Sequence, residues 1–153
     1  MIKIMFVCHG NICRSPMAEF YMKHIVEKSG LSDSFQIDST ATSLEEIGND
    51  IHYGTRRMLD KHNIPYEKRS ARRFTKSDYQ SYDYVLIMDK NNLKNILRII
   101  GEDCDNKIEL LLKYTGEEKS IADPWYTGGF DETYYDVSRG CNAFFKHLKD
   151  NVL

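Results

Sequence analysis

Two short runs of almost uninterrupted apolar residues constrain the fold of this chain more than any other feature. Residues 2–7 read IKIMFV, and residues 84–88 read YVLIM. Such runs are typical of strands that are buried on both faces, as in parallel sheets covered by helices. Both runs precede a segment with helical periodicity. The chain is therefore predicted to be an α/β protein with a parallel sheet.

The helix after the first run has a recognisable start and stop. Ser15 and Pro16 suit the N-cap and the first helical position, and Gly30 suits the end. Between them lies one apolar helical face, made of Met17, Ala18, Tyr21, Met22, Ile25 and Val26.

The rest of the chain continues the alternation. Strands are predicted around 35–39 and over 108–112, and helices through Met58, Leu59 and His62 and over 91–100. A final helix has its apolar stripe at Val137, Cys141, Phe144, Phe145 and Leu148. In such sheets, sites lie at the carboxyl ends of the strands. The segment CHGNICRS lies at such an end.

Composition limits the class of protein. We expect one domain over residues 1–153, with 41% hydrophobic and 29% charged residues and a net charge of −2. That charge gives no reason to expect a nucleic-acid or membrane partner, and there is no apolar run of about 20 residues or signal-peptide pattern. Four cysteines are too few for a disulfide scaffold, so we expect a cytoplasmic protein. We also expect a monomer. The basic run KRSARR, at 68–73, is interpreted as a solvated face.

The residues of the segment after the first strand suit attack on a phosphate-like group. Backbone N–H groups at a helix N-terminus bind anions and stabilise a thiolate, so Cys8 is expected to be nucleophilic. Gly10 and Asn11 tolerate the left-handed backbone that such a loop requires. Arg14 supplies a planar fork for two phosphate oxygens. A sulfur nucleophile, an amide cradle and a guanidinium stabilise charge without a metal, so no cofactor is expected.

Plainer interpretations of this segment are possible. A cysteine after a buried strand is usually a small core residue. Cys8 and Cys13 could be half of a metal site, but no second pair has suitable spacing, and His9 alone is a weak signal. A Walker loop is excluded, because the sequence has no G-x4-G-K-[ST].

The chain resembles the low-molecular-weight protein tyrosine phosphatases along nearly its whole length. The resemblance is carried by VCHGNICRSPMAE and DPWYTGGFDETYYDV, with FQIDSTAT, KHNI, YDYVLIMDKNNL and KIELLLKY between them. It implies a single domain with a four-stranded parallel sheet, helices on both faces and a phosphate-binding loop after the first strand. It also implies hydrolysis of phosphotyrosine, in proteins or as small aryl phosphates.

The resemblance also implies a role for each matching residue. Cys8 would form a phosphocysteine, Arg14 would bind the phosphoryl oxygens, and Ser15 would donate a hydrogen bond to the Cys8 sulfur. Asp123 would be the general acid, a choice that residue patterns alone could not make over Asp131 or Asp136. The loop and its supporting network would comprise His9, Gly10, Asn11, Ile12, Cys13, Ser15, Ser39 and His62.

The substrate slot departs from the family pattern. The family often has an aromatic wall in the loop after the second strand, but the nearest residues here are Leu44 and Glu45. Trp125 and Tyr126 can supply the other wall. We therefore expect weak peptide selectivity, tilted toward neutral or basic residues beside the phosphotyrosine.

Of three rival functions, a sequence feature tests the first two and an assay tests the third. An arsenate reductase would need two further cysteines close together, whereas Cys104 and Cys141 are far apart. A protein-arginine phosphatase has threonine before the second cysteine, where this chain has Ile12. A thiol redox sensor or silent phosphate-binding module would not turn over an aryl phosphate.

Overall fold

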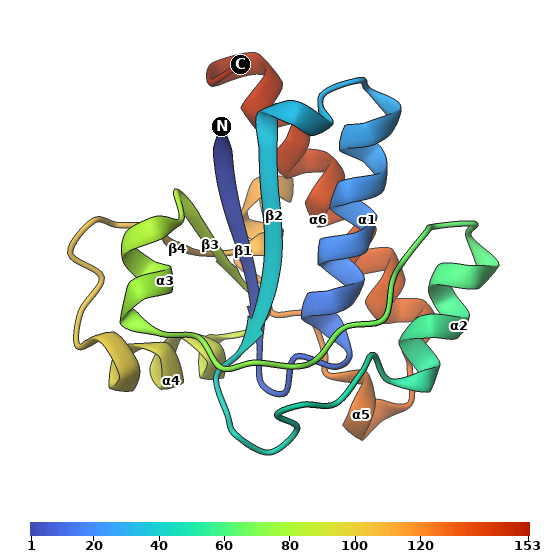
Figure 1. Cartoon of the computed structure of the whole chain (residues 1–153), viewed down its shortest axis with the longest axis horizontal. Helices are drawn as coiled ribbons and strands as arrows, with labels where there is room; N and C mark the ends of the chain where they lie inside the picture. Colours follow the sequence, from blue (N-terminus) through green and yellow to red (C-terminus); the bar gives the residue numbers. More distant parts are fainter.

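A four-stranded parallel sheet forms the centre of the protein in a computed structural model that describes residues 1–153 (Figure 1). Its strands are β1 (Ile2–Cys8), β2 (Phe35–Ala41), β3 (Tyr84–Ile87) and β4 (Ile108–Leu110). Their order is β2-β1-β3-β4, and every neighbouring pair is parallel. The predicted α/β fold with a four-stranded parallel sheet is confirmed.

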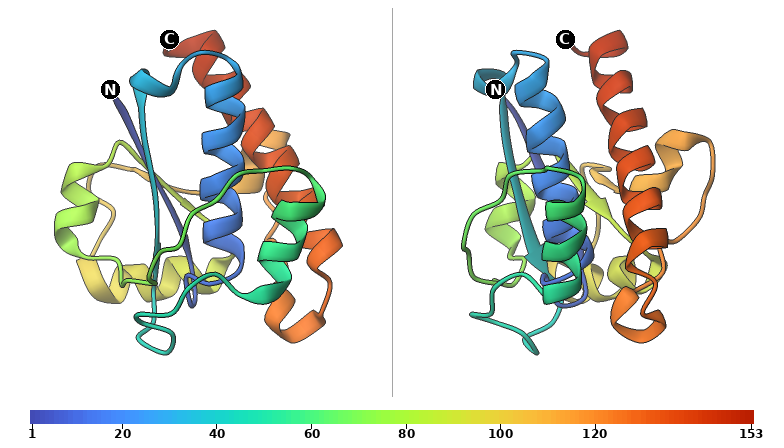
Figure 2. Two further views of the ribbon diagram at one scale, coloured as in Figure 1. Left: turned by 45° about the vertical axis from the view of Figure 1, so that its right-hand side comes forward. Right: turned by 90° about the vertical axis from the view of Figure 1, so that its right-hand side faces the viewer.

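Helices cover both faces of this sheet (Figure 2). One face packs against α1 (Arg14–Lys28) and α6 (Phe130–Asn151), with α2 (Tyr53–Lys61) beside them. The other face packs against α3 (Lys76–Ser81) and α4 (Lys90–Ile100). Three short helices complete the chain: η1 (Ser32–Ser34), η2 (Leu111–Thr115) and α5 (Pro124–Thr127).

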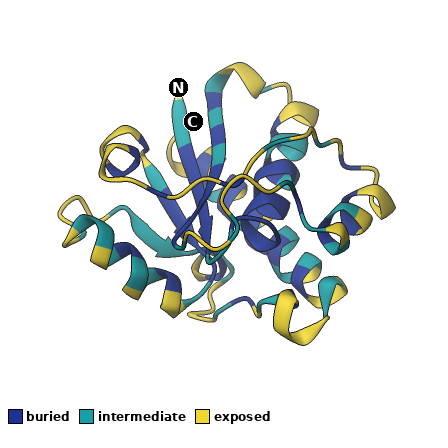
Figure 3. Cartoon of the chain, turned by 60° about the horizontal axis from the view of Figure 1, so that its bottom comes forward, coloured by how far each residue is buried: buried dark blue, intermediate teal, exposed yellow.

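The apolar run of β1 divides between two cores. Ile4 and Phe6 join the cluster under α1 and α6, whereas Met5 and Val7 join the cluster under α3 and α4. All four side chains are fully buried, which Figure 3 shows as the dark blue centre of the molecule. A strand whose alternate side chains meet two different cores must be apolar throughout, so the run predicted this position correctly.

Some element ends differ from the prediction. Helix α1 begins at Arg14 with Cys13 at its N-cap, so Ser15 lies in the first turn and its hydroxyl does not cap the helix. Pro16 is still tolerated there, because the N–H groups of a first turn have no helical partner. The predicted strand over 108–112 ends at Leu110, where the chain turns into η2.

Cys8 is the last residue of β1, the second strand from one edge of the sheet. The loop after β2 lies on one side of Cys8, and β3 leads into α4 on the other. Both connections meet at the lower end of the sheet in Figure 1. None of the helices is long and apolar enough to cross a membrane.

Candidate active site

The loop between β1 and α1 wraps around the sulfur of Cys8. The backbone N–H of Asn11 lies 3.3 Å from Cys8 Sγ, and the hydroxyl of Ser15 lies 3.1 Å from it. Asn11 has a left-handed backbone, with φ at 59°, whereas Gly10 does not. The expectation that Gly10 also needs this conformation was therefore wrong. A Cβ at this position would lie 3.4 Å from Glu46 Cγ, which is an ordinary contact distance, so packing does not require glycine here either.

The Asn11 side chain is itself fully buried and is the centre of a hydrogen-bond network. Its Nδ2 donates to Ser15 Oγ at 2.8 Å and to Ser39 Oγ at 2.9 Å, while its Oδ1 accepts from Arg72 N at 3.3 Å. Ser39 in turn donates to Glu19 Oε1 at 2.6 Å. Because the backbone N–H of Arg72 can only donate, the amide of Asn11 must turn its nitrogen toward the two serines.

This arrangement fixes where the Ser15 hydrogen can go. Ser15 Oγ accepts the Asn11 amide, so its own hydrogen is left for Cys8 Sγ at 3.1 Å or for the carbonyl of Thr40 at 3.4 Å. A hydroxyl donates preferentially to a negatively charged partner. The network therefore leaves the Ser15 hydroxyl and the Asn11 N–H as two donors beside the Cys8 sulfur.

Arg14 is almost fully buried, and its guanidinium is held from two sides. Nη1 donates to Asp89 Oδ2 at 2.6 Å and to the carbonyl of Ile121 at 2.9 Å, and Nη2 lies 3.3 Å from Asp123 Oδ2. Burial alone would lower the pKa of Arg14, but the charges of Cys8 and Asp123 and the hydrogen bond to Asp89 raise it above its ordinary value. The cation is thus permanent. Arg14 Nε has no partner in the protein.

Asp123 faces the loop from the opposite side of the site. It is the N-cap of α5, where Oδ1 accepts the N–H of Trp125 at 3.1 Å, and Pro124 fixes the first helical position. The segment before it is anchored twice: Ile121 N donates to the Met88 carbonyl at 2.8 Å, and the Thr133 hydroxyl donates to Ala122 O at 3.2 Å. The carboxylate is held near Arg14, and about a fifth of it remains exposed.

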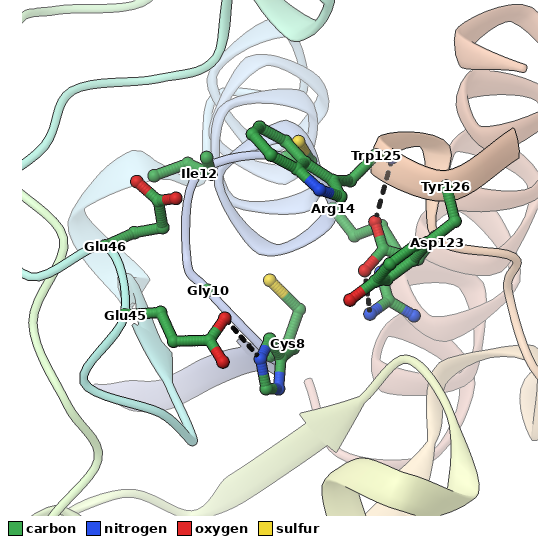
Figure 4. A pocket seen from close by; sticks show the side chains of 11 residues that line it. Cys8, Gly10, Ile12, Arg14, Glu45, Glu46, Asp123, Trp125 and Tyr126 are labelled. Carbon is green, nitrogen blue, oxygen red and sulfur yellow. Dashed lines mark hydrogen bonds and ion pairs between the residues drawn. The ribbon is translucent and has the colours of Figure 1, made fainter. Parts of the chain in front are cut away.

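These groups face one small cavity of about 80 Å³ (Figure 4). The sulfur of Cys8 points into it, with Glu45 on one side and Asp123 and Tyr126 on the other. Glu45 Oε2 lies 3.0 Å from His9 Nε2. The lining residues are Cys8, His9, Gly10, Ile12, Cys13, Arg14, Glu45, Glu46, Asp123, Trp125 and Tyr126.

Comparison with known proteins agrees with this geometry. Residues 3–153 match the family model for low molecular weight phosphotyrosine protein phosphatases. The rat low molecular weight phosphotyrosine protein phosphatase is 38% identical, covering 94% of this chain and 93% of its own. The chain belongs to this family.

Solved structures place the phosphatase among more than one kind of relative. The crystal structure of YfkJ from Bacillus subtilis has a TM-score of 0.96 and 32% identity, covering 100% of this chain and 98% of its own. That of a Drosophila arginine phosphatase has a TM-score of 0.87 and 30% identity, covering 98% of this chain and 99% of its own. The fold alone therefore does not choose between the two phosphoamino acids.

The prediction that His62 supports the phosphate loop is wrong. His62 follows the last residue of α2, and its ring stacks on Tyr134 with centroids 3.9 Å apart. The phosphatase instead uses Arg69, whose Nη2 donates to the backbone carbonyl of Asn11 at 2.6 Å. The basic run at 68–73, interpreted as a solvated face, thus braces the loop through Arg69 and through Arg72 N.

Three further residues near the site were not found from the sequence. Glu19 ends the buried network, and Asp89 holds Arg14. His52 lies behind the Asp123 loop, with its ring stacked on Phe130 at 5.2 Å and edge-on to Trp125 at 5.5 Å. Its backbone N–H also donates to Ile12 O at 2.8 Å. His52 therefore contacts both the loop after β1 and the segment that carries Asp123 and Trp125. An acid one helical turn after Ser15 is the only signal that pointed to Glu19.

We expect peroxide to inactivate the phosphatase reversibly through a Cys8–Cys13 disulfide. Both thiols are free and buried in the same loop, and burial together with the Cys8 charge raises the pKa of Cys13 to about 12. Attack of the Cys13 sulfur on a Cys8 sulfenic acid forms the S–S bond and releases water. Because the thiolate is the attacking form and the raised pKa keeps it scarce, this step should be slow at neutral pH and faster at alkaline pH. Mass spectrometry after peroxide treatment tests this. Sulfinic acid on Cys8 without the crosslink would contradict it.

Proposed function

We propose that this phosphatase hydrolyses phosphotyrosine through a phosphocysteine on Cys8. One observation carries the proposal: a buried chain of hydrogen bonds ends on the Cys8 sulfur, at the floor of a cavity that also receives Arg14 and Asp123. A nucleophile, an oxyanion-binding cation and a proton donor are the three groups that such a reaction needs.

In the first step, the Cys8 thiolate attacks phosphorus as the bond to the tyrosyl oxygen breaks. Arg14 binds the phosphoryl oxygens, with Nε, which has no protein partner, available as one of two parallel donors. The leaving oxygen lies opposite the sulfur, so its proton must come from another loop. Asp123 holds that position and donates the proton.

In the second step, a water molecule attacks phosphorus and gives its proton to Asp123. The P–S bond breaks and phosphate leaves, so Cys8 departs as a thiolate. Ser15 and the N–H of Asn11 stabilise that departing charge. No step transfers charge to a metal, because Arg14 and the loop amides supply the positive potential.

Phosphotyrosine is favoured over phosphoarginine by the residue beneath the slot. Ile12 lines the cavity and offers no hydrogen-bond partner to a guanidinium, whereas Trp125 and Tyr126 offer an aromatic wall to a tyrosyl ring. Turnover of matched phosphotyrosine, phosphoserine and phosphoarginine peptides, measured in excess EDTA, tests the proposal. We expect the phosphotyrosine peptide to be hydrolysed fastest. Faster hydrolysis of the phosphoarginine peptide would contradict the assignment, as would a requirement for metal.

Glu45→Trp is expected to lower KM for aryl phosphates by roughly twofold to tenfold, the value of one aromatic pair. Glu45 lines the cavity opposite Tyr126, so an indole there would complete a second wall. Glu45→Gln is the matched control, because it removes the charge without adding a ring. A KM that is unchanged in Glu45→Trp would show that position 45 does not touch the substrate ring.

A further inference from the structure

A second hollow adjoins the catalytic cavity and runs along α4. It encloses about 370 Å³ and shares four of its ten lining residues with the catalytic cavity, namely His9, Arg14, Asp123 and Tyr126. Its remaining wall comes from the start and exposed face of α4: Asp89, Asn91, Asn92, Lys94, Asn95 and Arg98. A substrate residue next to the phosphotyrosine can therefore enter this groove, which we call the α4 groove.

The α4 groove carries positive charge that the protein leaves unpaired. Lys94 and Arg98 are exposed, lie four residues apart on the same helix face and have no carboxylate within 4 Å. The one side-chain hydrogen bond of Arg98 is the donation from Nη1 to Asn95 Oδ1, at 3.5 Å. The two acids of the groove, Asp89 and Asp123, both lie against Arg14 and share its single positive charge. Lys94 and Arg98 outweigh the remaining negative charge, so the lining of the groove has a net formal charge of +1.

The opposite side of the catalytic cavity carries the opposite charge. Glu45 and Glu46 line it from the loop after β2, and Glu45 is largely exposed beside His9. In the sheet order, β1 lies between β2 and β3. Since Glu45 follows β2 and Lys94 follows β3, the acidic wall and the basic groove lie on opposite sides of Cys8 (Figure 4 shows the acidic side).

We propose that the α4 groove binds an acidic side chain of the peptide substrate, on one side of the phosphotyrosine. The Glu45 side disfavours acids and accepts basic or neutral residues on the other side. This inference rests on the proposed function and refines it: the repulsion expected from Glu45 acts on one flank only. The preferred substrate is a phosphotyrosine peptide whose two flanks carry opposite charges.

The groove is tested with three phosphotyrosine peptides. Two carry a pair of glutamates on one flank and a pair of lysines on the other, in the two possible orders, and the third has alanine flanks. In one of the two charged peptides the glutamates enter the α4 groove and the lysines lie beside Glu45. Contacts between exposed charges are weak and screened, so we expect kcat/KM for this peptide to exceed that for the reverse order by about threefold to tenfold at low salt. High salt should reduce this ratio toward one.

Variants assign the effect to the groove. Lys94→Gln and Arg98→Gln are each expected to lower kcat/KM for the preferred peptide by about twofold to fivefold. Neither should change turnover of a small aryl phosphate, which does not reach α4. Lys28→Gln is the matched control, since Lys28 is exposed at the far end of α1 from the site.

The two proposals fail in different ways. Equal kcat/KM for both charged orders, or the same ratio in Lys94→Gln and Arg98→Gln as in the unchanged protein, would overturn the groove. Absence of aryl phosphate turnover would overturn the proposed function instead. In that case the affinity of the Cys8→Ser protein for the three peptides, measured by fluorescence anisotropy, still tests the groove. No difference in affinity between the charged orders would then overturn it.

Discussion

A Cys8→Ser variant is expected to lose phosphatase turnover by at least about 10⁴-fold, the scale seen when a covalent nucleophile is removed. In this variant the hydrogen bonds from Ser15 and Asn11 reach a neutral serine hydroxyl in place of a thiolate. A neutral hydroxyl is a poor nucleophile. The loop itself should survive, because its shape depends on the buried network around Asn11 and not on the sulfur.

Binding distinguishes loss of chemistry from loss of structure in this variant. The loop amides and Arg14 are unchanged, so a phosphotyrosine peptide should bind the variant with an affinity close to the KM of the unchanged protein. Asn11→Ala is the contrasting variant, since it removes the centre of the network and should weaken both binding and turnover. Turnover retained in Cys8→Ser would contradict the proposed nucleophile.

Removing the carboxylate of Asp123 is expected to lower kcat for phosphotyrosine by about 10²–10⁴-fold, the usual value of general-acid help. The loss should be much smaller for aryl phosphates whose phenols are acidic, because those leave without a proton. Turnover of a series of aryl phosphates of graded phenol acidity measures this.

Two variants distinguish loss of the proton donor from loss of the α5 cap. Asp123→Asn keeps an acceptor for the Trp125 N–H and so keeps the cap of α5, whereas Asp123→Ala removes it. If Asp123 is the acid, both variants should show the same dependence on the leaving group. An equal loss for every substrate would assign Asp123 a role in positioning Arg14 instead.

The fold was largely predictable, because a strand buried on both faces is recognisable from its own few residues. The run IKIMFV must be apolar at every position to meet two cores, and that requirement is visible in six residues. The end of β4 was less predictable. Leu111 and Leu112 are as apolar as a buried strand, yet they turn into η2 and are buried there.

The site was only partly predictable, because its members come from distant segments. Cys8, Arg14 and Ser15 lie within eight consecutive residues, so their spacing pointed to their chemistry. Arg69 contacts that loop from 58 residues away, and its charged neighbours gave it the pattern of a surface residue. His62 was misplaced because its role was carried over from the resemblance, and nothing in its local sequence indicated that it stacks on Tyr134.

Trapping a phosphocysteine tests most directly whether Cys8 is the nucleophile. The Asp123→Asn protein, mixed with an aryl phosphate that has an acidic phenol, should form the phosphoenzyme normally but hydrolyse it slowly, because no base activates the water. After rapid acid quench, mass spectrometry of the proteolysed protein should find phosphate on Cys8, and Cys8→Ser should show none. If the Asp123→Asn protein turns over but the quenched sample carries no phosphate, or carries it on another residue, Cys8 is not the nucleophile.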